Sequence, residues 1–238
     1  MATLVAPRNH FPQEDAEALW KAVKGWGTDE KTIIKILGHR NASQRQQIRL
    51  VFQDIHLEDL VKRLESELSG DFERAVYRWT LEPSKRYAVL ANVAIKNANK
   101  DYHVMVEIVC MGVMRSMQDW QNLKLIFFMR PSKTKKGHHE EKLLEETSDD
   151  FYKAVNVAIH CINDHKKYYE KVLRNAIKGV GNNEDGQTRV FVTRAEKDLK
   201  DIKELYYKKN SVHLEDTMAK ENSGYYKKFL LTLLGKGG

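Results

Sequence analysis

The sequence predicts an all-α protein built from repeated helical segments. Apolar residues recur at intervals of three and four, as in Ile33, Ile34 and Leu37, and this spacing places side chains on one face of a helix. No segment alternates apolar and polar residues between turn signals, so strands are not expected. Only four prolines and 13 glycines interrupt the 238 residues, which leaves long stretches free to be helical.

The sequence also contains an internal repeat. Residues 17–80 align with residues 171–234 without a gap at an offset of 154. Matching pairs recur along the whole alignment: Ala22 with Ala176, Gly25 with Gly179, Gly27 with Gly181, Glu30 with Glu184, Arg40 with Arg194, Glu67 with Glu221, and Gly70 with Gly224. So many matches at one offset indicate two copies of one structural repeat.

A third, poorer copy lies between these two. Residues 96–109 follow residues 24–37, and residues 146–151 follow residues 67–72 at an offset seven residues larger. The extra residues must lie in the irregular stretch 111–141. We therefore expect an N-terminal tail and three repeats, with these bounds: tail 1–12, first repeat 13–83, middle repeat 84–163, last repeat 164–238.

Each repeat is expected to hold four or five short helices in the same order. In the first repeat the helical pattern runs through Trp20 to Lys24, Ile33 to Leu37, Ile48 to Phe52, Leu57 to Leu64, and Phe72 to Trp79. Gly25 and Gly27 separate the first two helices. Either Ser69 or Asp71 is expected to cap the last helix of the repeat.

Composition excludes several classes of protein. A net charge of +7 and a pI near 9.2 favour anionic partners, such as lipid headgroups or nucleic acid. The longest conspicuous apolar run, Leu123 to Met129, is far shorter than the roughly 18 residues of a membrane span. The first 15 residues do not resemble a signal peptide. Cys110 and Cys161 are too few for a disulfide framework, so we expect a reduced cytosolic protein without a transmembrane segment.

The glycine-rich turn of each outer repeat contains the candidate metal-binding groups. In KGWGTDE, residues 24–30, glycine backbone angles allow several carbonyl groups to point the same way. Carbonyl oxygens are hard donors that suit calcium but need a carboxylate beside them, and Glu67 follows Thr28 by 39 residues. The same spacing recurs from Asn182 to Glu221. In a site of this kind, coordination positions on the calcium ion stay open for lipid phosphate oxygens. Each loop taken alone is also compatible with an ordinary helix C-cap.

The pattern GxGT followed about 38 residues later by an acid, in repeats of about 70 residues, resembles the annexin repeat. Gly25 to Thr28 with Glu67 match it fully, and the segment TRAEKDLKDIKELYYKKN, residues 193–210, resembles plant annexins in particular. The resemblance implies four repeats, whereas three are recognisable here. The middle repeat begins like a second and ends like a third, as if about one repeat were missing, which would leave apolar faces for self-association to cover.

The resemblance also implies the site residues. Those expected to bind calcium are the carbonyls of Val23, Gly25 and Gly27 with Glu67, the carbonyls of Ile177, Gly179 and Gly181 with Glu221, and an accessory pair, Thr28 with Glu30. Trp26 and Lys24 are expected to contact the membrane. The middle loop, residues 96–101, has no glycine and is expected to bind no calcium.

The favoured interpretation is therefore calcium-dependent binding to acidic phospholipid membranes by a cytoplasmic protein that attaches peripherally when calcium rises. The alternative is a basic helical scaffold that binds nucleic acid or protein without calcium, although nucleic acid is not the favoured partner. The sequence predicts no enzyme, because it contains no nucleotide-binding or metalloprotease motif. A weak peroxidase-like activity at His39, or a nucleotidase activity, remains a lesser alternative.

Overall fold

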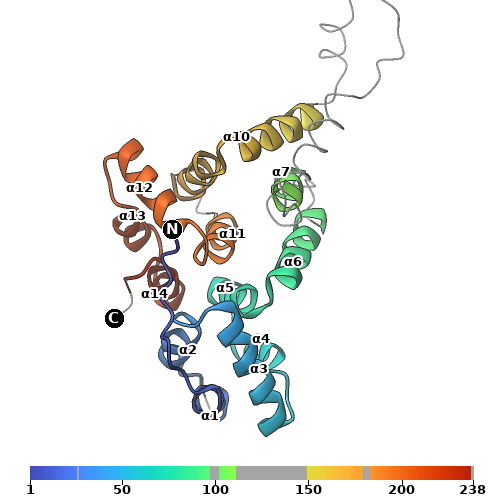
Figure 1. Cartoon of the computed structure of the whole chain (residues 1–238), viewed down its shortest axis with the longest axis vertical. Helices are drawn as coiled ribbons and strands as arrows, with labels where there is room; N and C mark the ends of the chain where they lie inside the picture. The colour runs from blue at the N-terminus through green and yellow to red at the C-terminus, as the bar shows by residue number, and fades with distance from the viewer. Residues whose placement is uncertain (26, 97–101, 111–148, 179–182, 237–238) are drawn as a thin grey trace, which may run out of the picture. The chain divides into compact units, whose positions relative to one another are not determined.

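The computed structural model describes residues 1–25, 27–96, 102–110, 149–178 and 183–236, and every regular element in these ranges is helical (Figure 1). The prediction of an all-α fold is confirmed. Within the same ranges, no helix combines the length and the apolar character that crossing a bilayer requires.

Five helices follow one another in the first repeat: α1 (Pro12–Val23), α2 (Glu30–Leu37), α3 (Ala42–His56), α4 (Leu60–Glu67) and α5 (Gly70–Thr80). Helix α1 packs against α2 and α3, and α4 packs against α5. Three of the helices begin at a side chain that accepts hydrogen bonds from the first turn, because the first N–H groups of a helix have no partner within it. These side chains are Asp29, Asn41 and Asp59.

The chain leaves α1 through two glycines with positive φ, 110° at Gly25 and 85° at Gly27. A side chain at either position would strain the backbone, so these residues separate α1 from α2 as the sequence predicted. Of the two candidate caps for α5, Ser69 is the N-cap residue, but its hydroxyl makes no capping hydrogen bond. Asp71 lies in the first turn instead, where its charge is favourable at the positive end of the helix.

The C-terminal helices are α10 (Asp149–Lys178), α11 (Glu184–Arg194), α12 (Leu199–Asn210), α13 (Leu214–Glu221) and α14 (Gly224–Leu233). Helix α10 is kinked at Asp164, where φ is −157° and ψ is 84°. Helix α14 packs against α2, α5 and α13, and α11 packs against α5 (Figure 1).

The chain forms two compact units, and the larger one joins distant parts of the sequence, Met1–Arg86 and Tyr169–Gly238. The ring of Phe72 lies 6.1 Å from that of Phe229 across the two parts. Charged side chains connect the two parts as well. Arg78 pairs with Asp185 at 2.6 Å, and the buried guanidinium of Arg45 pairs with Glu196 at 3.0 Å.

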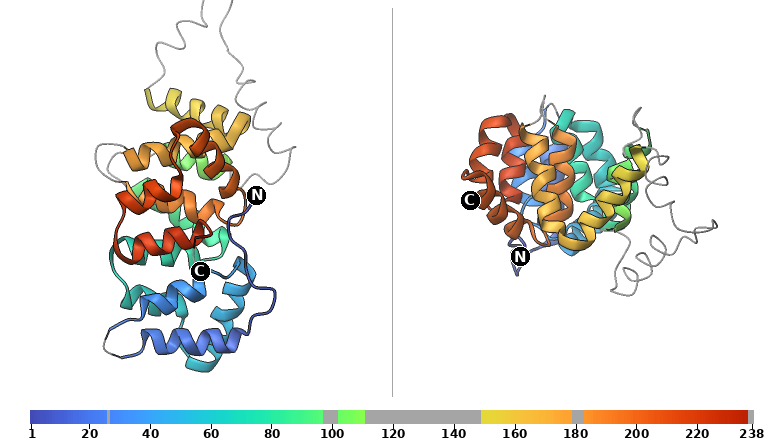
Figure 2. Two further views of the ribbon diagram at one scale, coloured as in Figure 1. Left: turned by 90° about the vertical axis from the view of Figure 1, so that its left-hand side faces the viewer. Right: turned by 90° about the horizontal axis from the view of Figure 1, so that it is seen from above.

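The N-terminal segment lies along the larger unit (Figure 2). The hydroxyl of Thr3 donates to the carbonyl of Leu233 at 2.6 Å, and its backbone N–H donates to that of Ala195 at 3.0 Å. The side chain of Gln44 donates to the carbonyl of Pro7 at 2.7 Å. Residues in the expected tail thus bind both sequence parts of this unit.

The smaller unit, Tyr87–Tyr168, contains most of α6 (Pro83–Lys96), all of α7 (Tyr102–Ile108) and the first part of α10. Side chains from α6 and α7 form one apolar cluster: Leu90, Ala94, Val104 and Ile108. Cys110 and Cys161 are buried in a second cluster with Ala158. The predicted irregular stretch 111–141 lies outside the described residues, as does most of the middle loop.

Candidate metal centre

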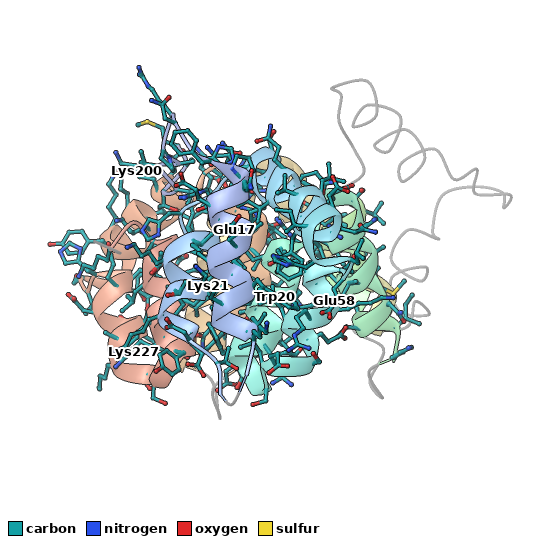
Figure 3. The ribbon with its side chains drawn as sticks, turned by 90° about the horizontal axis from the view of Figure 1, so that it is seen from below. Glu17, Trp20, Lys21, Glu58, Lys200 and Lys227 are labelled. Atoms are coloured by element: carbon teal, nitrogen blue, oxygen red, sulfur yellow. The ribbon has the colours of Figure 1, made fainter. Side chains whose placement is uncertain are left out.

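The first glycine loop begins where α1 ends, at the buried residue Val23. Trp20, labelled on α1 in Figure 3, holds this end of the helix against α3, because its ring stacks on His56 with 4.4 Å between centroids. The last carbonyl groups of a helix lack intrahelical partners and carry partial negative charge. The end of α1 therefore presents the carbonyl of Val23 as an acceptor for a cation or a donor.

The far acid of the predicted site lies beside this carbonyl. One nitrogen of Arg63, Nη2, donates to the Val23 carbonyl at 3.0 Å and lies 3.2 Å from Oε1 of Glu67. Since one atom contacts both groups, two predicted ligands that are 44 positions apart in the sequence lie around a single point. A cationic group already lies between them.

Hydrogen bonds hold the rest of the loop close to Glu67 and to the end of α1. The hydroxyl of Thr28 donates to the backbone carbonyl of Glu67 at 3.4 Å. The N–H of Asp29 donates to the carbonyl of Ala22 at 2.8 Å, and its carboxylate caps α2 by accepting from Thr32. These hydrogen bonds from Thr32 lower the pKa of Asp29. Glu30 follows as the first residue of α2, so the loop is fixed at both ends.

The last repeat places its described candidate residues in equivalent positions. Ile177 is buried near the end of α10, and Glu221 is the exposed last residue of α13. The N–H of Asn183 donates to the carbonyl of Ala176 at 2.9 Å, which matches the bond from Asp29 to Ala22. The remaining candidates, Gly179 and Gly181, and the predicted membrane residue Trp26 lie outside the described residues.

The acids of the two repeats line one cavity of about 380 Å³ in the larger unit. Each repeat contributes a matched pair, Glu30 and Glu67 from the first and Glu184 and Glu221 from the last. The sequence indicated the pairs separately but not that they face a common space. In the part of the chain that the structure describes, no three His, Cys, Asp or Glu side chains form a group that could hold a metal ion.

Arg63 is a residue of the candidate site that the sequence interpretation missed. Its spacing of four from Glu67 on one helix was a usable signal, because side chains four apart on a helix are neighbours. What the spacing does not reveal is the second contact, to the carbonyl of Val23 on another helix.

Two other predicted residues have contacts of their own. Lys24 is exposed and places its ammonium 5.6 Å from the centre of the Trp20 ring. His39 follows α2 and has Nδ1 2.9 Å from the carbonyl of Lys35. The absence of a catalytic role for His39 stays a prediction.

Comparison with known proteins decides the family. The family model described as Annexin matches residues 14–79 and 168–233, more than half of the chain. The chain belongs to the annexin family. The two matched segments correspond to the two copies of the internal repeat. The chain therefore has the all-α fold of annexins.

Plant annexins are among its relatives. The chain is 47% identical to Annexin-like protein RJ4 of Fragaria ananassa and 36% identical to Annexin D6 of Arabidopsis thaliana, with 99% of each chain covered in both comparisons. The solved structure of annexin III superimposes with a TM-score of 0.82 at 23% identity, covering 98% of this chain and 97% of that one, which shows the common fold.

The alignment with Annexin-like protein RJ4 spans 312 positions, whereas this chain has 238 residues. At least 74 positions of the alignment therefore have no counterpart in this annexin. That gap is about the length of one repeat. The division of this chain into three repeats stays a prediction.

Proposed function

We propose that this annexin binds acidic phospholipid membranes through calcium held in the loop between α1 and α2, with a second site in the last repeat. The observation that carries the proposal is the convergence of the Val23 carbonyl and the Glu67 carboxylate on one cation, the guanidinium of Arg63. Two oxygens from distant segments that attract one cation are arranged to attract another.

The donor set fits calcium. Calcium takes six to eight oxygen ligands at about 2.3–2.6 Å, and carbonyl groups with one carboxylate are suitable donors. The carbonyls of Val23, Gly25 and Gly27 with Glu67 provide at most five oxygens, so coordination positions remain for water or lipid phosphate. Thr28 and Glu30 would hold an accessory ion at the same loop.

The membrane contact follows from the position of the loop. Gly25 and Gly27 are exposed, and Lys24 beside them adds a positive charge that favours acidic headgroups. Trp26 lies between the two glycines, where an indole ring can enter the lipid interface. Because such a bridge forms only with calcium, we place the protein in the cytoplasm at rest and at membrane surfaces when calcium rises.

The test is sedimentation with phosphatidylserine vesicles, with and without calcium, for the wild type and the double variant Glu67→Gln/Glu221→Gln. We expect calcium-dependent sedimentation of the wild type that a chelator reverses, and at least a tenfold loss of apparent affinity in the double variant, because each site loses its only carboxylate. Glu65→Gln, an exposed acid on α4, is the matched control and should bind like the wild type.

Vesicle binding that is unchanged by the chelator but weakens as the salt concentration rises would contradict the proposal. That result would support the alternative of a basic scaffold held to phosphates by charge alone. Circular dichroism of each variant without calcium verifies that the fold is retained.

A further inference from the structure

Arg63 occupies the place that the proposed first calcium ion needs. Its Nη2 lies 3.0 Å from the Val23 carbonyl oxygen and 3.2 Å from Glu67 Oε1. A calcium ion bound to the same two oxygens would lie about 2.3–2.6 Å from each. Both cations cannot occupy the space between the two oxygens, so Arg63 must withdraw before calcium binds.

The charge of Arg63 opposes calcium binding, as its position between the two oxygens does. Glu67 is the only carboxylate in the proposed first ligand set, and Arg63 neutralises it by ion pairing. Both side chains are largely shielded, with exposed fractions of 28% for Arg63 and 23% for Glu67, so water screens the pair only partly. A guanidinium near the ion would repel calcium even after it moved away from the oxygens.

The repeat provides an internal comparison. The offset of 154 that aligns Glu67 with Glu221 and Val23 with Ile177 aligns Arg63 with Thr217. The hydroxyl of Thr217 donates to the carbonyl of His213, the N-cap residue of α13, at 3.1 Å. A threonine carries no charge and is too short to make the two contacts of Arg63, so the two proposed sites differ at this position.

We propose that Arg63 is an internal competitor of calcium, which lowers the calcium affinity of the first site. This inference rests on the proposed calcium function and assigns an affinity-setting residue within it. The first site would then load only at a higher calcium concentration than it would without this arginine.

Another role for the same contacts leads to the opposite prediction. Arg63 also caps the end of α1 and lies 5.8 Å from the centre of the Trp20 ring. If its main effect were to hold Val23 and Glu67 in position for the ion, removing it would weaken calcium binding. The sign of the affinity change therefore separates competition from positioning.

The experiment isolates each site by removing the carboxylate of the other. Calcium titration is followed by isothermal calorimetry without membranes, using the full chain. Glu221→Gln reports the first site, and Arg63→Thr is added to it. We expect calcium to bind about tenfold more tightly after this addition, a change of about 1.4 kcal/mol.

The reciprocal arm places an arginine in the last repeat. Glu67→Gln reports the last site, and adding Thr217→Arg should weaken its calcium binding about tenfold. Arg8→Thr, which removes an exposed arginine of the N-terminal segment, is the matched control and should leave both affinities unchanged. The reciprocal arm decides the question if Arg63→Thr fails to fold by circular dichroism.

An unchanged or weaker affinity in Arg63→Thr, or an unchanged affinity in Thr217→Arg, would overturn the inference while leaving the calcium function standing. If the Glu221→Gln and Glu67→Gln backgrounds bind no calcium at all while remaining folded, the proposed function fails first and the inference with it. The two failures are therefore distinguishable.

Discussion

Phe72 and Tyr226 occupy equivalent positions in the first and last repeats but make different contacts. Phe72 packs its ring against Phe229, whereas the hydroxyl of Tyr226 donates to the carbonyl of Glu184 at 2.9 Å and lies 3.0 Å from the hydroxyl of Thr188. Burial of the Tyr226 phenol raises its pKa, because the phenolate would lose its hydration. The folded state therefore requires Tyr226 to stay protonated.

This requirement predicts a pH dependence. In the unfolded chain Tyr226 loses its proton near pH 10, whereas in the folded chain it keeps the proton to higher pH. Its contribution to the free energy of unfolding is thus fully present below about pH 10 and is lost as the pH rises further. Tyr226→Phe should be less stable at pH 8 by about 1 kcal/mol, because two hydrogen bonds are lost.

The measurement is urea unfolding at about pH 8 and pH 10.5, followed by circular dichroism. Between these two values the stability of Tyr226→Phe should fall less than that of the wild type, because the variant has no proton to lose there. Tyr225→Phe, which keeps its ring beside Phe72, is the neighbouring control and should show the wild-type slope. Equal slopes in all three proteins would show that Tyr226 titrates normally.

At the level of helices, the start of α3 depends on a reciprocal pair of side-chain bonds. Asn41 accepts from the backbone N–H of Gln44 at 2.9 Å, and the Gln44 side chain accepts from the N–H of Asn41 at 3.1 Å. Asn41→Ala removes one bond of this capping box, so we expect a loss of about 1 kcal/mol in the free energy of unfolding.

Urea unfolding at neutral pH measures this loss. Ser43→Ala changes an exposed residue of the same helical turn and should shift the stability by less than about 0.5 kcal/mol. If the two substitutions cost the same, the effect is a general response of the turn and not the loss of a cap.

Helices and the loop were predictable from the sequence because their causes are local. The spacing of Ile33, Ile34 and Leu37 places all three on the buried face of α2, and Gly25 and Gly27 have the positive φ that only glycine adopts easily. The cap of α5 was less certain, since Ser69 and Asp71 both suit a helix start. Which residue takes that position depends on the backbone that enters the helix.

Contacts between distant segments were not predictable, because no local pattern encodes them. The spacing between Thr28 and Glu67 indicated a shared site, but not the nitrogen of Arg63 that links Val23 to Glu67. The sequence repeat likewise identified two equivalent segments without indicating that they pack into one unit. The packing of the two segments depends on complementary shape and charge. For example, the guanidinium of Arg45 lies 3.7 Å from the centre of the Trp79 ring and pairs with Glu196.

At the scale of the molecule, the larger unit depends on both of its sequence parts. Helix α14 packs against α2 and α5, and α11 packs against α5, so the first repeat alone would expose apolar surface that α14 and α11 cover. The ion pair between Arg78 and Asp185 would also lose one partner. The middle of the chain ties the two parts together and thereby raises their effective concentration.

We therefore expect fragments 1–86 and 169–238 to be poorly helical alone and to form one folded complex when mixed. Equimolar mixing at tens of micromolar should raise the helical signal at 222 nm and give one peak of the summed mass in size-exclusion chromatography. Phe229→Ala in the second fragment removes a fully buried ring that faces Phe72, at a cost of about 3 kcal/mol, and should weaken association more than 100-fold. Lys227→Ala, a change on the same helix, should associate like the unmodified fragment.

The contrary outcome is a helical signal of the mixture equal to the sum of the signals of the separate fragments. It would mean that these contacts form only when the residues between Arg86 and Tyr169 connect the two parts. The covalent connection would then provide most of the association free energy.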